Sequence, residues 1–385
     1  MAVELLTSSN LTTACAQLDA AEFVAVDTEF HAERRYRPQL YLVQVHIPGQ
    51  DTWIVDPLSE DLLFKIAPTL CRPAWLVHGG RHDIGLLSSF CGASSGVVID
   101  TQIAAGFIQT HYPASLATLI ETYLGRRIEK LATLSDWSKR PLREGQLLYA
   151  AEDVELLPPL WQQIKEKLLA QDRLDLALQA CDAARCDVMQ GGNSEIAWTQ
   201  IAARHTLQPQ QAGVLQELAA WREERAANAN QPPHSILSNA MLIDLAKRQP
   251  LTVDSLRQNR RLPKAVVRNQ GSALLEHISR AAGRPQWAWP QLIPKNSRAY
   301  QTGLWMDCLI QHYASELNFA PRLMFPEHIK EKLILAFPGT REELGVQLGS
   351  FRNALIGDIL WAGLNGKSGL FLRDGKTSIT VIEPD

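Results

Sequence analysis

The sequence predicts an α/β domain followed by two all-α domains. Residues 21–110 alternate short runs rich in β-branched residues with helical runs, which is typical of a mixed sheet flanked by helices. From about residue 171 the β-branched runs almost disappear and helical periodicity dominates. A faint repeat at a spacing of 88 residues indicates two copies of one small helical domain. We therefore expect domains at residues 1–204, 205–290 and 291–385.

The first domain is expected to contain a sheet of five strands. The strands are predicted at residues 22–29, 39–47, 51–55, 74–77 and 97–100, and Pro48–Asp51 is predicted to form a hairpin turn. Helical patterns follow at residues 83–90, 101–109, 115–124 and 142–169. This order favours a mixed sheet covered by helices over residues 1–170.

The helical half shows clear breaks between its elements. Leu215, Leu218 and Trp221 recur at helical spacing within one predicted helix, which Pro232 and Pro233 end. Residues 238–248 form the next helix, and residues 250–255 read as a stop followed by a new N-cap. The repeat aligns residues 233–256 with 321–344 without a gap, and residues 283–290 are a predicted linker.

Composition excludes several classes of protein. The chain has 385 residues, 46% of them hydrophobic, which is enough for two or three domains with sizeable cores. We expect no signal peptide, and no run approaches the roughly 18 apolar residues of a membrane span. The six cysteines have no Cys-x-x-Cys spacing, which argues against a zinc site or a disulfide framework and favours a reducing cytoplasm.

Charge is unevenly distributed along the chain. Residues 1–204 carry 17 Lys and Arg against 25 Asp and Glu, whereas residues 205–290 carry 11 against 6. An acidic first domain does not attract a polyanion through its own net charge. Divalent cations and a basic neighbouring domain would reverse that locally.

Four carboxylates and a tyrosine stand out within the first 155 residues. Asp27 and Glu29 end an apolar strand and share one face by the period-two rule. Asp83 opens an apolar helix, and Tyr149 and Asp153 are four apart on another, so they share a helix face. If the three elements converge, four carboxylates meet.

Such a cluster of acids predicts a metal site. Like charges held together are unfavourable unless a cation neutralises them, and oxygen ligands without Cys favour Mg²⁺ or Mn²⁺. Two such ions about 3.5–4 Å apart activate water and stabilise the leaving oxygen of a phosphodiester. Tyr149 would orient the attacking water or help to deprotonate it. Taken singly, each piece has a plainer structural explanation as a strand end, a solvated pair or a helix cap.

The order and setting of these residues resemble the DEDD 3′–5′ exonucleases of the tyrosine subtype. The runs at 27–30, 36–44, 54–57, 100–102, 136–137 and 140–142 make the chain similar to bacterial ribonuclease D over roughly residues 3–290. The resemblance implies a ribonuclease H-like fold and two bound Mg²⁺ or Mn²⁺ ions. Asp27 would bridge the ions, Glu29 and Asp153 would complete the first site, and Asp83 would hold the second.

The same resemblance implies a 3′–5′ exoribonuclease that releases 5′-mononucleotides from structured precursors such as tRNA. Tyr149 would position the nucleophile, and Phe30 and His78 are candidates for holding the terminal nucleotide. Two alternatives stay open on the residues alone: a DNA-directed exonuclease with the same site, and a non-catalytic RNA-binding scaffold. Recognition of the 2′-hydroxyl depends on geometry that the sequence does not reveal.

Segments of the helical half resemble the helicase-and-RNase-D C-terminal (HRDC) domain. Its first copy carries a basic cluster that is a candidate for phosphate contact, formed by Arg257, Arg260, Arg261, Lys264 and Arg268. A solvated helix face would explain the same residues equally well. The second copy lacks such a cluster, so whether it binds RNA stays open. We expect a cytoplasmic monomer whose partner is RNA with a single-stranded 3′ end, and no membrane association.

Overall fold

The computed structural model describes residues 2–31, 35–59, 61–92, 94–128, 136–189, 198, 201, 207–282, 297–373 and 376–381. The chain forms two compact units. One comprises Met1–Glu29, Leu40–Met189 and Ile293–Asp385, and the other Phe30–Gln39 and Gln190–Leu292. The predicted linker at residues 283–290 lies outside the described residues.

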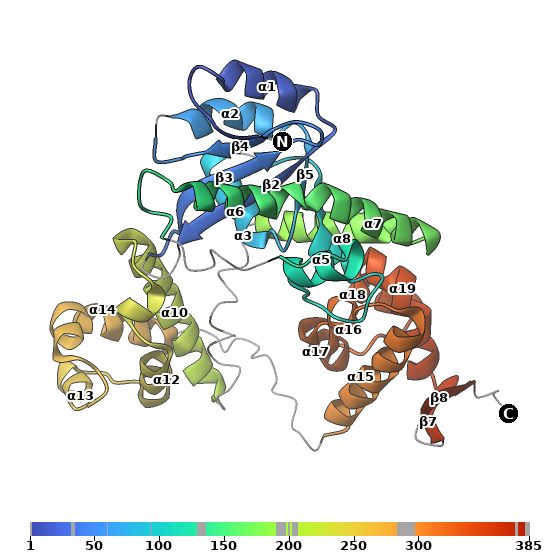
Figure 1. Ribbon diagram of the computed structural model, residues 1–385. Coiled ribbons are helices and arrows are strands. Elements are labelled where there is room, and N and C mark those ends of the chain that lie inside the picture. The colour runs from blue at the N-terminus through green and yellow to red at the C-terminus, as the bar shows by residue number, and fades with distance from the viewer. Residues whose placement is uncertain are drawn as a thin grey trace. The chain divides into compact units, whose positions relative to one another are not determined.

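The first unit is built on a six-stranded mixed sheet with the order β1-β4-β3-β2-β5-β6 (Figure 1). β2 pairs in parallel with β5, and β5 with β6, whereas β3 and β4 form an antiparallel hairpin. The strands are β1 (Val3–Leu5), β2 (Phe23–His31), β3 (Gln39–His46), β4 (Thr52–Val55), β5 (Ala74–Val77) and β6 (Val98–Asp100). The five predicted strands are confirmed, and the three-residue β1 was too short for its pattern to predict.

Helices cover both faces of this sheet. Val24 and Val26 of β2 pack in one hydrophobic cluster with α1, α2 and α3, whereas Ala25 packs in another with α4, α5, α7 and α8. This is the alternation expected of a strand buried on both faces. The helices are α1 (Leu11–Asp19), α2 (Leu62–Leu70), α3 (Arg81–Cys91), α4 (Thr101–Ala105), α5 (Leu116–Leu124), α6 (Glu144–Glu155), α7 (Leu157–Ala170) and α8 (Leu174–Met189).

The helix predicted at residues 142–169 is divided in the structure. α6 ends at Glu155, and α7 begins at Leu157 with prolines in its first turn. Pro158 and Pro159 lack backbone N–H groups, so they are tolerated where those groups have no helical partner and not inside a helix. The division directs α6 across β1 and β4 and α7 toward β5.

The helical half contains two five-helix segments whose elements correspond at the predicted spacing of 88 residues. α11 and α16 begin at Pro233 and Pro321, and the caps Asn230 and Asn318 both adopt positive φ. We call residues 209–282 the first helical copy and residues 298–364 the second. The helices are α10 (Pro209–Ala229), α11 (Pro233–Ile236), α12 (Asn239–Arg248), α13 (Val253–Arg257) and α14 (Lys264–Ala282), then α15 (Arg298–Leu317), α16 (Pro321–Met324), α17 (Glu327–Leu335), α18 (Arg341–Leu348) and α19 (Ser350–Leu364).

The N-caps repeat as well. The Thr252 side chain accepts a hydrogen bond from the Ser255 N–H at the start of α13, and Thr340 does the same with Glu343 at the start of α18. The second copy is followed by an antiparallel hairpin that the sequence pattern does not predict, formed by β7 (Ser368–Arg373) and β8 (Lys376–Val381). The prediction that residues 291–385 are all-α is therefore wrong for this hairpin.

The second helical copy is docked on the α/β domain. The Ala320 N–H donates to the Gly106 carbonyl at 2.7 Å, and the Asn318 side-chain amide donates to the Ile108 carbonyl at 2.6 Å. The rings of Phe107 and Phe351 lie 5.9 Å apart within one hydrophobic cluster that spans both parts. This contact also explains why α4 ends at Ala105, four residues earlier than predicted, because the chain must turn into the interface.

Candidate active site

β2 places Asp27 and Glu29 on one face, beyond the Phe23–Ala25 stretch that pairs with β5. Because Ala25 packs on the side of the sheet that α7 covers, the period-two rule directs the next two odd-numbered side chains to the same side. Both carboxylates are partly exposed. The α/β architecture therefore presents them past this paired stretch, near the usual place of a site in such sheets.

The acidic cluster, defined as Asp27, Glu29, Asp83 and Asp153, comes together in the structure. Loss of hydration raises the pKa of Asp27 well above its ordinary value, and the charges of the other three carboxylates raise it further. Loss of hydration, then Asp153 and Asp83, raise the pKa of Glu29 to about 8. The acids predicted from three separate sequence contexts are thus near neighbours.

Asp83 is tied to β2 by a residue that sequence reasoning missed. The Thr28 hydroxyl donates a hydrogen bond to Asp83, which is only 7% exposed in the first turn of α3. Burial raises the pKa of Asp83, and this hydrogen bond opposes that rise. Thr28 alternates with Asp27 and Glu29 and faces the opposite side of the strand, a signal that could have identified it.

Tyr149 and Asp153 share one face of α6, as predicted. Loss of hydration and then the charges of Asp153, Glu29 and Asp27 raise the pKa of Tyr149, so its phenol keeps its proton at neutral pH. The hydroxyl is hydrogen-bonded to Asp153, whose pKa burial raises to about 6. A protonated phenol donates a hydrogen bond, and this favours orientation of water over its deprotonation.

The donor set of the acidic cluster fits a hard divalent cation. Within the described ranges, none of the four carboxylates forms an ion pair with a Lys or Arg side chain. Like charges gathered without a counter-charge raise one another's pKa, and a bound cation would remove that penalty. Among the same residues, however, no three His, Cys, Asp or Glu side chains already stand in a ligating arrangement. The chemistry of the donor set therefore fits a hard cation, whereas the side-chain positions in this structure do not form a ligand group.

Arg140 fixes the chain segment that precedes α6. Its guanidinium donates to both carboxylate oxygens of Asp56 at 2.5 and 2.7 Å and to the carbonyls of Trp137, Lys139 and Tyr41 at 2.7 to 2.9 Å. These bonds use all five donors of the arginine side chain. They hold buried Trp137, whose ring lies 6.4 Å from that of Tyr149. No local pattern in the sequence predicts this role of Arg140.

His78 and Phe30, the candidates for contact with the terminal nucleotide, differ in their surroundings. His78 is hydrogen-bonded at both ring nitrogens, to the Thr101 hydroxyl at 2.9 Å and the Ala114 carbonyl at 3.1 Å. A contact from His78 to a nucleotide would therefore use the ring face. Phe30 follows Glu29 directly in β2 and is partly buried.

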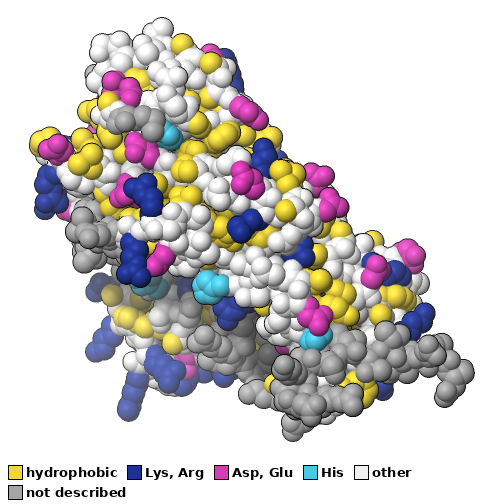
Figure 2. Space-filling model, turned by 45° about the vertical axis from the view of Figure 1, so that its right-hand side comes forward, with side chains coloured by type: hydrophobic (Ala, Val, Ile, Leu, Met, Phe, Trp, Pro, Cys, Tyr) yellow, Lys and Arg dark blue, Asp and Glu magenta, His cyan; other side chains and the backbone are white. Residues whose placement is uncertain are grey.

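The basic cluster of the first helical copy is exposed. Its five side chains lie on α13, the following loop and the start of α14. Arg257 pairs with Asp254 at 3.0 Å, and Arg261 lies 3.9 Å from Asp244. Both guanidinium groups are exposed, so these pairs leave them accessible to phosphate. Figure 2 shows basic and acidic side chains interspersed over the upper part of the visible face, and Lys and Arg side chains in the majority at its lower left.

Comparison with known proteins identifies the parts of this chain. Residues 3–169 match the family model described as 3′-5′ exonuclease, and residues 211–278 match that of the HRDC domain. Ribonuclease D of Gluconacetobacter diazotrophicus is 30% identical over 98% of this chain and 94% of its own length. That of Pseudomonas paraeruginosa is 29% identical over 91% and 94%.

Solved structures show the same fold. The crystal structure of Escherichia coli RNase D superposes with a TM-score of 0.80, at 24% identity, covering 95% of this chain and 99% of that one. The catalytic core of RRP6 from Trypanosoma brucei gives a TM-score of 0.53 over 72% of this chain and 79% of that one, also at 24% identity. No helix among the described residues is long and apolar enough to cross a bilayer. With an exonuclease domain, an HRDC domain and a full-length match to a curated relative, the chain belongs to the ribonuclease D family.

Proposed function

We propose that this 3′–5′ exoribonuclease trims the 3′ ends of structured RNA precursors, tRNA and other small stable RNAs among them, and releases 5′-mononucleotides. The observation that carries the proposal is the convergence of four carboxylates and Tyr149 in a chain of the ribonuclease D family. The E. coli relative is described as an exoribonuclease involved in structured RNA processing, which supports the substrate class.

The acidic cluster would hold two Mg²⁺ or Mn²⁺ ions, with Asp27 shared between them. Bound there, the ions would supply activation of water and stabilisation of the leaving oxygen. Asp83 would keep its orientation through Thr28, and Asp153 through Tyr149. The neutral Tyr149 hydroxyl would orient the attacking water, because a phenol with a raised pKa is a donor and a poor base.

RNA would be drawn to the enzyme chiefly by its first helical copy. Residues 205–290 carry 11 Lys and Arg against 6 Asp and Glu, and the exposed basic cluster would contact phosphates. Phe30 and the ring face of His78 would contact the terminal nucleotide. A cytoplasmic monomer is the proposed state of the protein, and six free cysteines are consistent with a reducing compartment.

The proposal is tested with a 5′-labelled RNA that ends in a single-stranded 3′ tail. In Mg²⁺ or Mn²⁺ we expect a ladder that shortens one nucleotide at a time from the 3′ end, and intact RNA in EDTA. A matched DNA oligonucleotide run in parallel decides the sugar preference. Intact RNA in every lane, with a gel shift still present, would instead support a non-catalytic scaffold.

The site assignment is tested with Asp27→Asn and Asp153→Asn. Each substitution removes a negative charge at constant volume, so we expect hydrolysis to be abolished while RNA binding persists. Glu22→Gln is the matched control, because Glu22 is an exposed acid that directly precedes β2. Retention of a tenth of wild-type turnover by either Asp variant would exclude its carboxylate from the assignment.

A further inference from the structure

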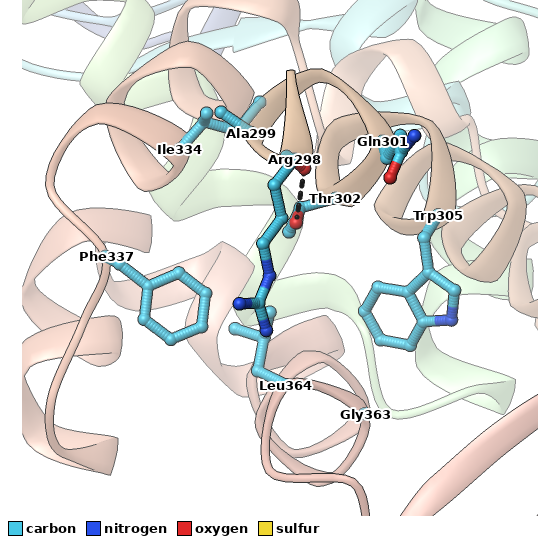
Figure 3. Close-up of a pocket in the computed structure, with 9 residues that line it drawn as sticks. All are labelled: Arg298, Ala299, Gln301, Thr302, Trp305, Ile334, Phe337, Gly363 and Leu364. Atoms are coloured by element: carbon cyan, nitrogen blue, oxygen red, sulfur yellow. Dashed lines mark hydrogen bonds between the residues drawn. The ribbon is translucent and has the colours of Figure 1, made fainter. Parts of the chain in front are cut away.

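The second helical copy contains an open cleft of about 640 Å³ between α15, the end of α17 and α19 (Figure 3). Two aromatic side chains and one cation line it, Trp305, Phe337 and Arg298, together with Leu364 and Gly363. Its described lining contains no acidic residue. The cleft is within the size range of small-ligand sites.

The cleft is built around the Trp305 ring. A Cβ atom on Gly363 would lie 2.1 Å from Cη2 of Trp305, so only glycine at this position lets the indole lie against α19. Phe337 is 57% exposed, which is unusual for a phenylalanine. Figure 3 shows the Arg298 side chain extending between the Phe337 and Trp305 rings. Among the described residues Arg298 has no acidic partner.

The first helical copy shows that the fold does not require this cleft. At the 88-residue spacing, Trp305 corresponds to Glu217. Glu217 is mostly buried and pairs with His277 and Arg280, each at 3.0 Å. Phe337 corresponds to the polar Gln249. An ion-pair network thus occupies the place that is open and aromatic in the second copy.

We propose that this cleft binds one nucleotide of single-stranded RNA, with its base against Trp305 and Phe337 and its phosphate on Arg298. The proposal rests on the proposed function, which makes RNA the polymer that this protein meets. Aromatic faces stack on any base, and each stacked base contributes about 1–3 kcal/mol. A guanidinium binds phosphate and also stacks. The N-terminus of α15, where Arg298 lies, adds positive potential.

The cleft is fixed relative to the exonuclease domain. The second copy is held there by the Asn318 and Ala320 hydrogen bonds and by the shared hydrophobic cluster. Arg173 of the α/β domain adds a hydrogen bond to the Asn318 carbonyl at 3.4 Å across the same interface. RNA bound in the cleft would therefore be held in a constant position relative to the acidic cluster.

The test measures binding of fluorescein-labelled oligoadenylate to the full chain in EDTA, by anisotropy, so that hydrolysis does not interfere. We expect Phe337→Ala and Arg298→Gln each to weaken binding about tenfold, in line with the loss of one stacked base or one phosphate contact. Phe337→Trp should restore binding. Phe64→Ala and Arg322→Gln are matched controls, since Phe64 is 58% exposed on α2 and Arg322 is exposed on α16, both outside the cleft. Melting curves verify that all variants fold.

Photo-cross-linking with 4-thiouridine RNA supplies an independent readout. Cross-links to peptides that contain Trp305 or Phe337 support the proposal. Unchanged affinity of both cleft variants, or cross-links confined to the first helical copy, would overturn it. The proposed function is tested separately, by hydrolysis of RNA in Mg²⁺. If the wild-type protein cleaves RNA and the cleft variants bind RNA normally, only the cleft proposal is wrong. If the wild-type protein binds RNA through the cleft and does not cleave it, only the proposed function is wrong.

Discussion

Asp56 and the acidic cluster belong to the same domain, yet their surroundings differ. Asp56 is 5% exposed and receives two hydrogen bonds from Arg140, which spends its other donors on backbone carbonyls. Asp27, Glu29, Asp83 and Asp153 lie together with no Lys or Arg partner among the described residues, and their pKa values are raised. The charge of Asp56 is balanced by Arg140, whereas the four carboxylates of the acidic cluster have no such counter-charge.

This difference separates structural charge from functional charge. A buried acid that stabilises a fold is paired and fully hydrogen-bonded, because an unpaired buried charge is costly. A group of acids that raise one another's pKa destabilises the free protein and persists where a ligand removes the penalty. The two regions should therefore respond oppositely when a carboxylate is neutralised.

The largest effect is expected for Asp56→Asn, which leaves the Arg140 guanidinium without its counter-charge. Breaking a buried ion pair in this way costs about 3–5 kcal/mol of the free energy of unfolding. Chemical denaturation of the full chain measures it. Asp19→Asn is the matched control, because Asp19 pairs with Arg72 at 2.5 Å on the surface and its loss should cost about 1 kcal/mol or less. Equal losses of stability in the two variants would show that the Asp56–Arg140 pair stabilises the fold no more than a surface ion pair does.

Tyr149 touches both regions, through Asp153 on one side and Trp137 on the other. For Tyr149→Phe we expect kcat to fall about 100-fold with KM nearly unchanged, since the hydroxyl would act on water and not on RNA. Steady-state kinetics on a short RNA measure both constants. Tyr123→Phe, at a hydroxyl that donates to Gln109 and not to the acidic cluster, should leave both constants unchanged. A rise in KM alone would assign Tyr149 to substrate binding.

Local rules predicted two pairs of residues within the acidic region. Alternation along a strand placed Asp27 and Glu29 together, and a spacing of four on a helix did the same for Tyr149 and Asp153. Both rules use only residues that are close in sequence. They could not predict the role of Arg140, because its partners Tyr41 and Asp56 are distant in sequence.

Packing between distant segments also decides where each helical copy docks, which the sequence repeat does not predict. The cap Asn230 of the first helical copy accepts a hydrogen bond from the Arg37 N–H at 3.0 Å, whereas its counterpart Asn318 donates to Ile108. The two caps are equivalent in the structure, but the 88-residue repeat contains nothing about which surface each one meets. Docking partners follow from three-dimensional contact and not from the local pattern.

Divalent cations should stabilise the protein through the acidic cluster, more strongly at high pH. Protons compete for the same oxygens, and Asp153 and Glu29 have pKa values near 6 and 8. At a Mn²⁺ concentration 100 times the Kd, the stabilisation is about 2.7 kcal/mol. Thermal melts with Mn²⁺ or EDTA should show a rise in Tm that grows between these two pH values. The rise should be absent in Asp27→Asn, and its persistence there would place the cation elsewhere.

For Glu29→Gln in EDTA we expect a change in stability whose sign is opposite to that of Asp56→Asn. The pKa of Glu29 rises from 4.5 to about 8 on folding. Its contribution to the stability of the folded state is therefore fully present below pH 4.5 and is lost as the pH rises toward 8. Glutamine does not ionise, so the variant should match wild type below pH 4.5 and have a higher Tm than wild type at pH 8. Glu22→Gln, at an exposed acid outside the cluster, should melt with wild type throughout. A destabilised Glu29→Gln at pH 8 would mean that Glu29, like Asp56, already has its counter-charge in the fold, and the contrast between the two regions would fail.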